Sequence, residues 1–307
     1  MSASTSIVLT SLIGDALALG PHWIYDQSAI ATQLGAIAGY ADPMASYHPG
    51  KGAGDFTHYG DQTMVLLRSV AAHGTFQAEA FAADWQAYWG DAGTISYRDG
   101  ATRTTLQNLA QGRPLLAAAS SSHDIAGAAR IAPLFLLPWA SSADLMAAAR
   151  AQTAITHADP DVIETAAYFA HAAFLVREGM NVADALHRAA GGDALPSHLK
   201  AALEAAAASS NSSVSDQAAA LAHGQDCSVS SAFPLVCHFL LRYPSDTAKA
   251  LTQNALVGGD SAARGLLIGL VLGARPDAEP LPEAWLDGLR ARGEIQQLAD
   301  QLAVTRG

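Results

Sequence analysis

The sequence has little positive charge, few aromatic residues and almost no cysteine. Of its 307 residues, 17 are Lys or Arg and 28 are Asp or Glu, which gives a formal net charge of −11. This surplus of acid repels phosphodiester backbones, so we do not expect the chain to bind nucleic acid. Charged residues make up only 15% of the chain and hydrophobic residues 50%, which is the reverse of a disordered protein.

Long hydrophobic runs and paired cysteines are also lacking. The apolar stretch 6–12 follows no positive charge and is soon interrupted by Gly14 and Asp15, so it is not expected to be a signal peptide. The apolar run 265–274 is about half as long as a membrane-spanning helix needs to be. The two cysteines, Cys227 and Cys237, cannot form a disulfide framework. We therefore expect a soluble, cytoplasmic protein without a membrane partner.

Apolar residues recur at helical spacing along most of the chain, and alternating strand patterns are scarce. No linker rich in Pro, Ser or charge divides the chain, so we expect a single all-α domain over 1–307. Helices are expected over 142–155, 161–178, 182–190, 197–207, 216–222, 232–242, 246–256 and 261–273, with a C-terminal helix over 283–304. The low-complexity run 207–215 is expected to be a surface loop.

The longest irregular segment is expected from Gly35 to Asp61, where Gly, Pro, Tyr and His are frequent. Loops of this length are uncommon inside a compact domain, and they are usually functional. This segment is therefore the first place to look for a site.

Three polar clusters interrupt the apolar helical pattern. Asp15 lies among apolar residues, where a buried carboxylate is costly unless it is hydrogen-bonded or bound to a metal. Asp61 precedes an apolar helix expected from Met64 to Val70, and Asp260 precedes the helix expected over 261–273. An aspartate at a helix start is commonly an N-cap, so each also has an ordinary structural explanation.

The three clusters together favour a functional site. Two helix N-termini, each preceded by glycine and an oxygen ligand, would bind a hard cation and a phosphate at the same place. Magnesium prefers oxygen ligands, while backbone N–H groups and the helix dipole attract anions.

The sequence contains, in this order, the motifs GDALALG at 14–20, YGDQT at 59–63, GAARIAPL at 127–134, TH at 156–157 and GGDSAARGLLIGLVLGA at 258–274. Together they resemble the ADP-ribosylglycohydrolase family, and the resemblance runs from about residue 7 to residue 275. Segments 21–26 and 59–62 are most similar to the branch that contains the J-type lens crystallins and selenoprotein J. The resemblance implies a compact all-α globule.

The resemblance implies a cleft in which two magnesium ions and ADP-ribose bind, and in which the N- or O-glycosidic bond from ADP-ribose to a side chain is cut. The family's metal ligands lie in a Thr-Asp-Asp-Thr motif and a Gly-Gly-Asp-x-Asp-Thr motif. In the first motif, Asp61 and Thr63 match, but Gly60 replaces a threonine and Gln62 replaces an aspartate.

The second motif also lacks some of the family's ligand residues. Asp260 matches its first aspartate, whereas Ala262 and Ala263 stand in place of the second aspartate and the threonine. Two carboxylates compensate the charge of two dications poorly in a partly desolvated cleft. We therefore expect one magnesium ion at most, with ligands from Asp61, Asp260, Gln62 and Ser261.

The resemblance also implies contacts to a bound nucleotide. His22 stands, by spacing, where the family has an acidic residue, and Asp26 is a candidate substitute for it. His157 matches a histidine close to ADP-ribose and Arg130 matches a family arginine, although hydrogen bonds inside the protein are an alternative role for both. The remaining candidate substrate contacts are His58, Tyr59, Gly60, Gly127 and Gly259.

Two hypotheses about function follow. In the first, the protein hydrolyses an ADP-ribosyl or related glycosidic bond, with Asp61 and Asp260 as catalytic residues assisted by Asp15 or Asp26. In the second, it is noncatalytic, and either binds an ADP-ribose-like ligand or has a crystallin-like structural role. The expected partner is small-molecule or protein-linked ADP-ribose. The bond that is cut and the oligomeric state are left open.

Overall fold

The computed structural model describes residues 2–191 and 195–304 of the chain. In these two ranges the chain forms helices and connecting segments, and its only β-pairings are two isolated bridges, so the expected all-α fold is confirmed. The helices are α1 (Ala3–Ala18), α2 (Gln27–Leu34), α3 (His58–His73), α4 (Ala78–Gly90), α5 (Gly100–Ala110), η1 (Leu115–Ala117), α6 (Ala126–Ala129), η2 (Ala132–Leu136), α7 (Ser142–Ala154), α8 (Pro160–Arg177), α9 (Val182–Ala189), α10 (Ser197–Ser210), α11 (Asp216–His223), α12 (Val229–Arg242), α13 (Thr247–Leu256), α14 (Ser261–Gly273), α15 (Glu283–Gly288) and α16 (Arg292–Val304).

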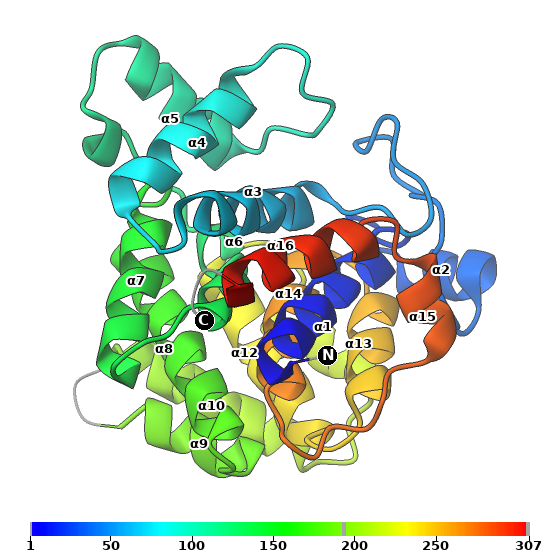
Figure 1. The fold of residues 1–307 in the computed structure, drawn as a ribbon. Helices are drawn as coiled ribbons and strands as arrows, with labels where there is room; N and C mark the ends of the chain where they lie inside the picture. The colour runs from blue at the N-terminus through cyan, green and yellow to red at the C-terminus, as the bar shows by residue number, and fades with distance from the viewer. Residues whose placement is uncertain (1, 192–194, 305–307) are drawn as a thin grey trace.

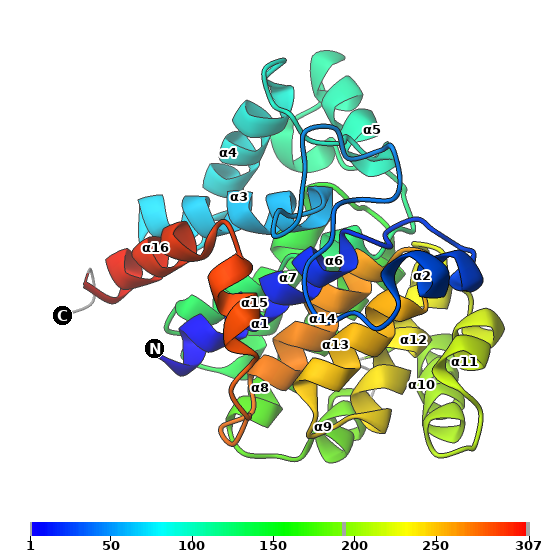
Figure 2. The same ribbon diagram turned by 90° about the vertical axis from the view of Figure 1, so that its right-hand side faces the viewer.

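Helices α1 and α14 lie side by side in the middle of the fold (Figures 1 and 2). Nearly every residue of both helices is buried, as expected for helices that are apolar all round. Glycines allow their backbones to touch. A Cβ on Gly14 would lie 2.2 Å from the carbonyl oxygen of Gly265, and a Cβ on Gly269 would lie 2.3 Å from that of Thr10. The glycines of the two terminal motifs therefore bring the central helices together.

The other helices surround this pair. Helices α8, α12 and α13 pack against α14, and α3 and α16 cover α1 (Figure 1). Helices α4 and α5 stand away from the body at the top of both views (Figures 1 and 2). None of the helices in the two described ranges combines the length and the apolar composition that a membrane span requires.

Several boundaries differ from those expected, and α12, for example, begins at Val229 rather than at Ala232. The C-terminal helix is split into α15 and α16 by extended Leu289, which lets the Arg290 backbone N–H bond to the Gly54 carbonyl at 3.1 Å. Helix α3 begins at His58 rather than Met64, because the Thr57 hydroxyl caps it. Helix α10 continues to Ser210, so only the later part of the low-complexity run is a loop.

The irregular segment therefore covers residues 35–57. Hydrogen bonds and an ion pair connect this segment to α15 and to the residues that follow α15. The Tyr40 hydroxyl donates to the Trp285 carbonyl at 2.7 Å, and the Trp285 indole donates to the Ala38 carbonyl at 2.8 Å. Arg290 forms a 3.0 Å ion pair with Asp55. These contacts hold the 35–57 loop beside the start of α3.

Candidate active site

The first polar cluster joins α1 to α3. Asp15 is fully buried in α1, and its carboxylate accepts bonds from the Thr57 N–H at 2.8 Å, the Thr57 hydroxyl at 2.6 Å and the Gly60 N–H at 3.1 Å. Burial raises the pKa of Asp15 to about 6, although the bonds from Thr57 oppose the rise. A Cβ on Gly60 would lie 2.5 Å from this carboxylate. Asp15 and Gly60 thus position the start of α3.

We expect Asp15→Ala to lower the free energy of unfolding by about 3 kcal/mol, because two buried backbone N–H groups lose their acceptor. Asp15→Asn keeps one acceptor oxygen and should lose about half as much. Urea denaturation of the three proteins measures both differences. Equal stability of Asp15→Ala and the unchanged protein would contradict this role.

A strained turn follows α1. Trp23 has φ +64°, and it is the one non-glycine residue with a left-handed backbone in the part of the chain that the structure describes. Its N–H donates to the Gly259 carbonyl at 2.8 Å, and the Gly259 N–H donates to the Ile24 carbonyl at 2.8 Å. Gly258 and Gly259 are left-handed as well. Strain of this kind persists only where surrounding contacts enforce it, and it is common at functional sites.

The turn and the start of α3 meet at Asp260, which precedes α14. The carboxylate of Asp260 is buried and accepts from the Tyr59 hydroxyl at 2.6 Å and the Trp23 indole at 3.3 Å. His22 Nε2 lies 3.4 Å from its other oxygen. Burial raises the pKa of Asp260, while the Tyr59 bond and the charge of Arg264 oppose the rise.

Asp124 and Cys227 complete this centre. One ligand atom from each of Asp124, Cys227 and Asp260 lies within 4.8 Å of the other two. The Tyr59 hydroxyl also lies 3.4 Å from Asp124. Burial and the charges of Asp260 and Asp99 raise the pKa of Asp124 well above its usual range. Asp260 is buried and Cys227 is partly exposed, so the centre borders the surface.

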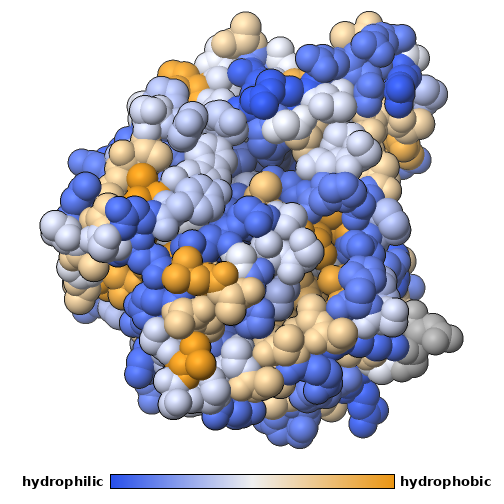
Figure 3. Space-filling view, turned by 180° about the vertical axis from the view of Figure 1, so that it is seen from behind, coloured by the Kyte–Doolittle hydropathy of each residue, from blue (hydrophilic) through white to orange (hydrophobic). Residues whose placement is uncertain are grey.

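Aromatic rings gather beside this centre. The ring centroids of His58 and Tyr59 are 3.8 Å apart, those of Trp23 and Tyr97 4.9 Å, and those of Trp23 and Tyr47 5.3 Å. Tyr47 is half exposed. Seen from behind, the surface is hollowed between the two upper projections, and polar residues surround the hollow (Figure 3). Aromatic faces beside carboxylates suit a ribose and a base.

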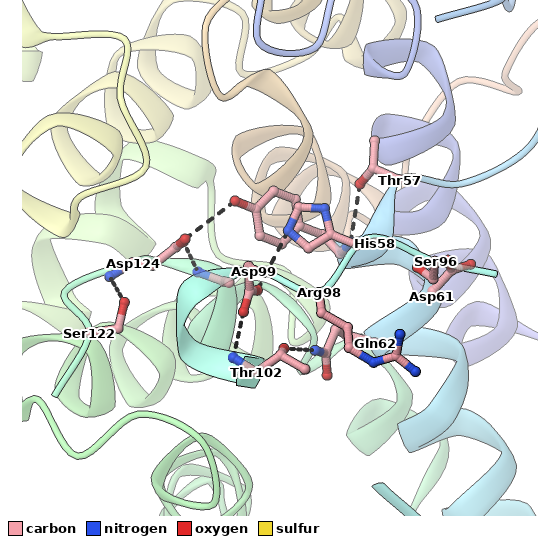
Figure 4. A network of polar contacts seen from close by, with 12 residues as sticks. Thr57, His58, Asp61, Gln62, Ser96, Arg98, Asp99, Thr102, Ser122 and Asp124 are labelled. Carbon is pink, nitrogen blue, oxygen red and sulfur yellow. Dashed lines mark hydrogen bonds and ion pairs between the residues drawn. The ribbon is translucent and has the colours of Figure 1, made fainter. Parts of the chain in front are cut away.

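Histidines in this region are held uncharged or are paired. Burial lowers the pKa of His22 well below its usual range, and that of His48 to about 4. His58 Nε2 lies 3.5 Å from Asp99 (Figure 4). Burial acts to raise the pKa of Asp99, but the bond and charge of His58 outweigh burial and lower it.

Asp61 belongs to a different group of side chains. Its carboxylate accepts from the Lys51 ammonium at 2.9 and 2.7 Å, and from the Ser96 hydroxyl at 2.5 Å. Residues two apart on a helix do not share a face, so Asp61 and Tyr59 point to different sides of α3. In Figure 4, Asp61 and Ser96 lie at one end of the network and Asp124 at the other.

Gln62 and Arg130 lie in the interior. The Gln62 side chain donates to the Thr102 hydroxyl at 3.0 Å and accepts from the Trp85 indole at 2.7 Å and from Arg130 at 3.0 Å. Arg130 also donates to Gln152 at 2.7 Å. Burial lowers the pKa of Arg130 to about 9. Both side chains are almost fully buried, and they join α3 to the segment around α6.

Gly127 and His157 pack on each other beside this network. A Cβ on Gly127 would lie 2.6 Å from His157 Nδ1, and the same nitrogen is 2.9 Å from the Thr156 hydroxyl. Burial lowers the pKa of His157 to about 4. Asp26 caps α2 at the surface, where its carboxylate accepts from the N–H groups of Ser28 and Ala29.

The four magnesium ligands expected from the sequence are divided between these groups. Asp61 is neutralised by Lys51, and the amide of Gln62 is committed to protein partners. Asp260 lies with Asp124 and Cys227, and the Ser261 hydroxyl is buried without a partner among the described residues. Asp61 and Gln62 therefore do not fit a magnesium site shared with Asp260 and Ser261.

Comparison with known proteins identifies the family. The family model described as ADP-ribosylglycohydrolase matches residues 4–307, and the chain belongs to this family. It is similar to a solved structure entitled "ADP-ribosylglycohydrolase-related protein complex", with a TM-score of 0.71 and 19% identity over 98% of this chain and 96% of that one. This likeness shows the shared fold. Among curated proteins nothing matches.

Proposed function

We propose that the protein hydrolyses an N- or O-glycosidic bond of an ADP-ribosyl or related substrate, as a hydrolase of its family. The observation that carries the proposal is the pair Asp124 and Asp260, whose carboxyl groups share the Tyr59 hydroxyl. Glycosidic bonds are usually hydrolysed by a pair of acidic residues that lie in different environments.

The two carboxyl groups have separate roles in this proposal. Asp124, whose pKa is raised by burial and by neighbouring negative charges, is protonated and donates its proton to the leaving nitrogen or oxygen as the bond to ribose breaks. Ionised Asp260 stabilises the positive charge that develops on ribose and accepts a proton from the attacking water. The Tyr59 hydroxyl returns this proton to Asp124, which restores the starting state.

The rate of hydrolysis should depend on pH on both sides of an optimum. It falls as the pH drops through the raised pKa of Asp260, which must be ionised, and as the pH rises through that of Asp124, which must be protonated. Asp99 is one of the charges that raise the pKa of Asp124. Asp99→Asn should therefore lower the pKa of Asp124 and move the alkaline side of the pH–rate profile to lower pH. An alkaline side that does not move would argue against Asp124 as the acid.

The second candidate is a noncatalytic protein that binds ADP-ribose or has a structural role, close to the crystallin-like branch of the family. The observation that favours it is the loss of polar ligands, since Ala262 and Ala263 are fully buried in α14 and the Gln62 amide is used inside the protein.

One assay separates the two candidates. The protein is incubated with peptides that carry ADP-ribose on arginine or serine, and released ADP-ribose is measured beside binding of free ADP-ribose by calorimetry. Release that disappears in Asp260→Asn supports the hydrolase. Binding without release of product supports the noncatalytic protein.

A further inference from the structure

We infer that Lys51 is a built-in cation that takes, at Asp61, the place of the divalent ion expected there from the family resemblance. This inference concerns metal binding, and it holds whether or not the protein is a hydrolase. It starts from the contact between the two side chains, in which one ammonium group lies within 2.9 Å of both carboxylate oxygens.

The carboxylate of Asp61 accepts three hydrogen bonds from partners on two different segments. Lys51 comes from the 35–57 loop, and Ser96 comes from the connection between α4 and α5 and donates to the same oxygen that Lys51 approaches at 2.7 Å. The side chains of Lys51 and Asp61 are 16% and 11% exposed, so the pair is screened little by solvent. A dication at this carboxylate would have to displace the ammonium or lie against it.

The two neighbours of Asp61 that could help to bind a dication, Gln62 and Asp15, are already engaged. The next residue, Gln62, is neutral and committed to other partners, and Asp15 is engaged by the start of α3. The Lys51 ammonium offsets the charge of Asp61 directly, while the nearby Asp15 carboxylate is already bound by N–H groups at the start of α3. A lysine therefore balances the one carboxylate that is otherwise unpaired, whereas a divalent ion would add a second positive charge in a largely buried place.

Lys51 also has a positioning role that a free ion would not provide. Its backbone N–H closes a turn to the His48 carbonyl at 3.2 Å, and the His48 ring stacks on Trp23 with centroids 5.3 Å apart. The ion pair thus joins the 35–57 loop to α3 beside the aromatic rings that gather next to the centre. Because the Lys51–Asp61 ion pair holds the 35–57 loop without a bound metal, ligand binding should not require magnesium.

Binding of Mn²⁺, followed by electron paramagnetic resonance, tests the inference directly. The unaltered protein should bind no Mn²⁺ at Asp61 up to millimolar concentration. Lys51→Met removes the ammonium and leaves Asp61 and the Ser96 hydroxyl, so we expect an affinity for Mn²⁺ at least tenfold higher. Adding Asp61→Asn to Lys51→Met should abolish that gain. Lys249→Met, which removes an exposed lysine of α13, is the matched control and should change nothing.

The outcomes that would overturn the inference are equally specific. The inference would be wrong if the unaltered protein bound Mn²⁺ and Asp61→Asn abolished this binding, because Lys51 would then not occupy the place of an ion. A folded Lys51→Met protein that gains no affinity would show that Asp61 is not a cation site at all. If Lys51→Met does not fold, Lys51→Gln, which keeps a polar group at the same place, is measured in the same way.

Discussion

Asp260→Asn should reduce the rate of ADP-ribose release by about 10³-fold, within the range found when a general acid or base is removed. The substitution keeps the shape of the side chain and its bond with Tyr59, but it removes the negative charge that would stabilise the ribosyl cation. Since the loss occurs in the transition state, we expect it in kcat, with KM changed less than about threefold.

Asp124→Asn should cause a loss of similar size with substrates that have a poor leaving group, because the proton donor is missing. Asp26→Asn is the control. Asp26 lies in the segment 21–26, and its carboxylate caps α2 at the surface. Its substitution should therefore leave the activity unchanged. Full activity in Asp260→Asn would contradict the assignment of the site.

Gly265→Ala and Gly269→Ala should each lower the free energy of unfolding by more than about 3 kcal/mol, or prevent folding. The added methyl group would lie 2.4 Å from the Gly14 carbonyl oxygen in the first variant and 2.3 Å from that of Thr10 in the second. Backbone atoms cannot move aside as a flexible side chain can, so α1 and α14 would have to separate. Thermal or urea unfolding measures the loss.

Gly293→Ala is the matched control for these variants. Gly293 is exposed in α16, and a Cβ there would meet nothing within 4 Å. Because alanine favours a helix more than glycine does, stability should stay equal or rise by up to about 1 kcal/mol. Stable Gly265→Ala and Gly269→Ala proteins would show that close approach of α1 and α14 is not what requires these glycines.

The fold class could be predicted from the sequence because helical periodicity is a local property. Helix α14 begins at Ser261 and ends at Gly273, as the pattern indicated. The split between α15 and α16 could not be predicted in the same way, because the contact that accompanies it, from Arg290 to Gly54, joins residues that are far apart in the chain.

The site was predictable only where a motif pointed to it. Asp260 was a candidate from its glycine-rich motif, and it lies at the centre described above. Asp124, Cys227 and Lys51 had no local signal, since an aspartate in a polar turn, a lone cysteine and a loop lysine are common in any sequence. Their importance comes from tertiary contacts with Asp260 and Asp61.

Asp15 and Arg130 show the opposite case. Their sequence context suggested chemistry, and both are engaged in buried hydrogen bonds inside the protein. A buried carboxylate or guanidinium can serve catalysis, but it can also form the hydrogen bonds that buried polar groups need. The sequence alone does not distinguish these two roles.

A crystal structure of Asp260→Asn with ADP-ribose, grown with magnesium present, tests the account most directly. We predict that the anomeric carbon of the terminal ribose lies within about 4 Å of the side chains at positions 124 and 260, and that Lys51 still contacts Asp61. A ribose bound away from these two side chains, or a magnesium ion on Asp61 with Lys51 displaced, would contradict it.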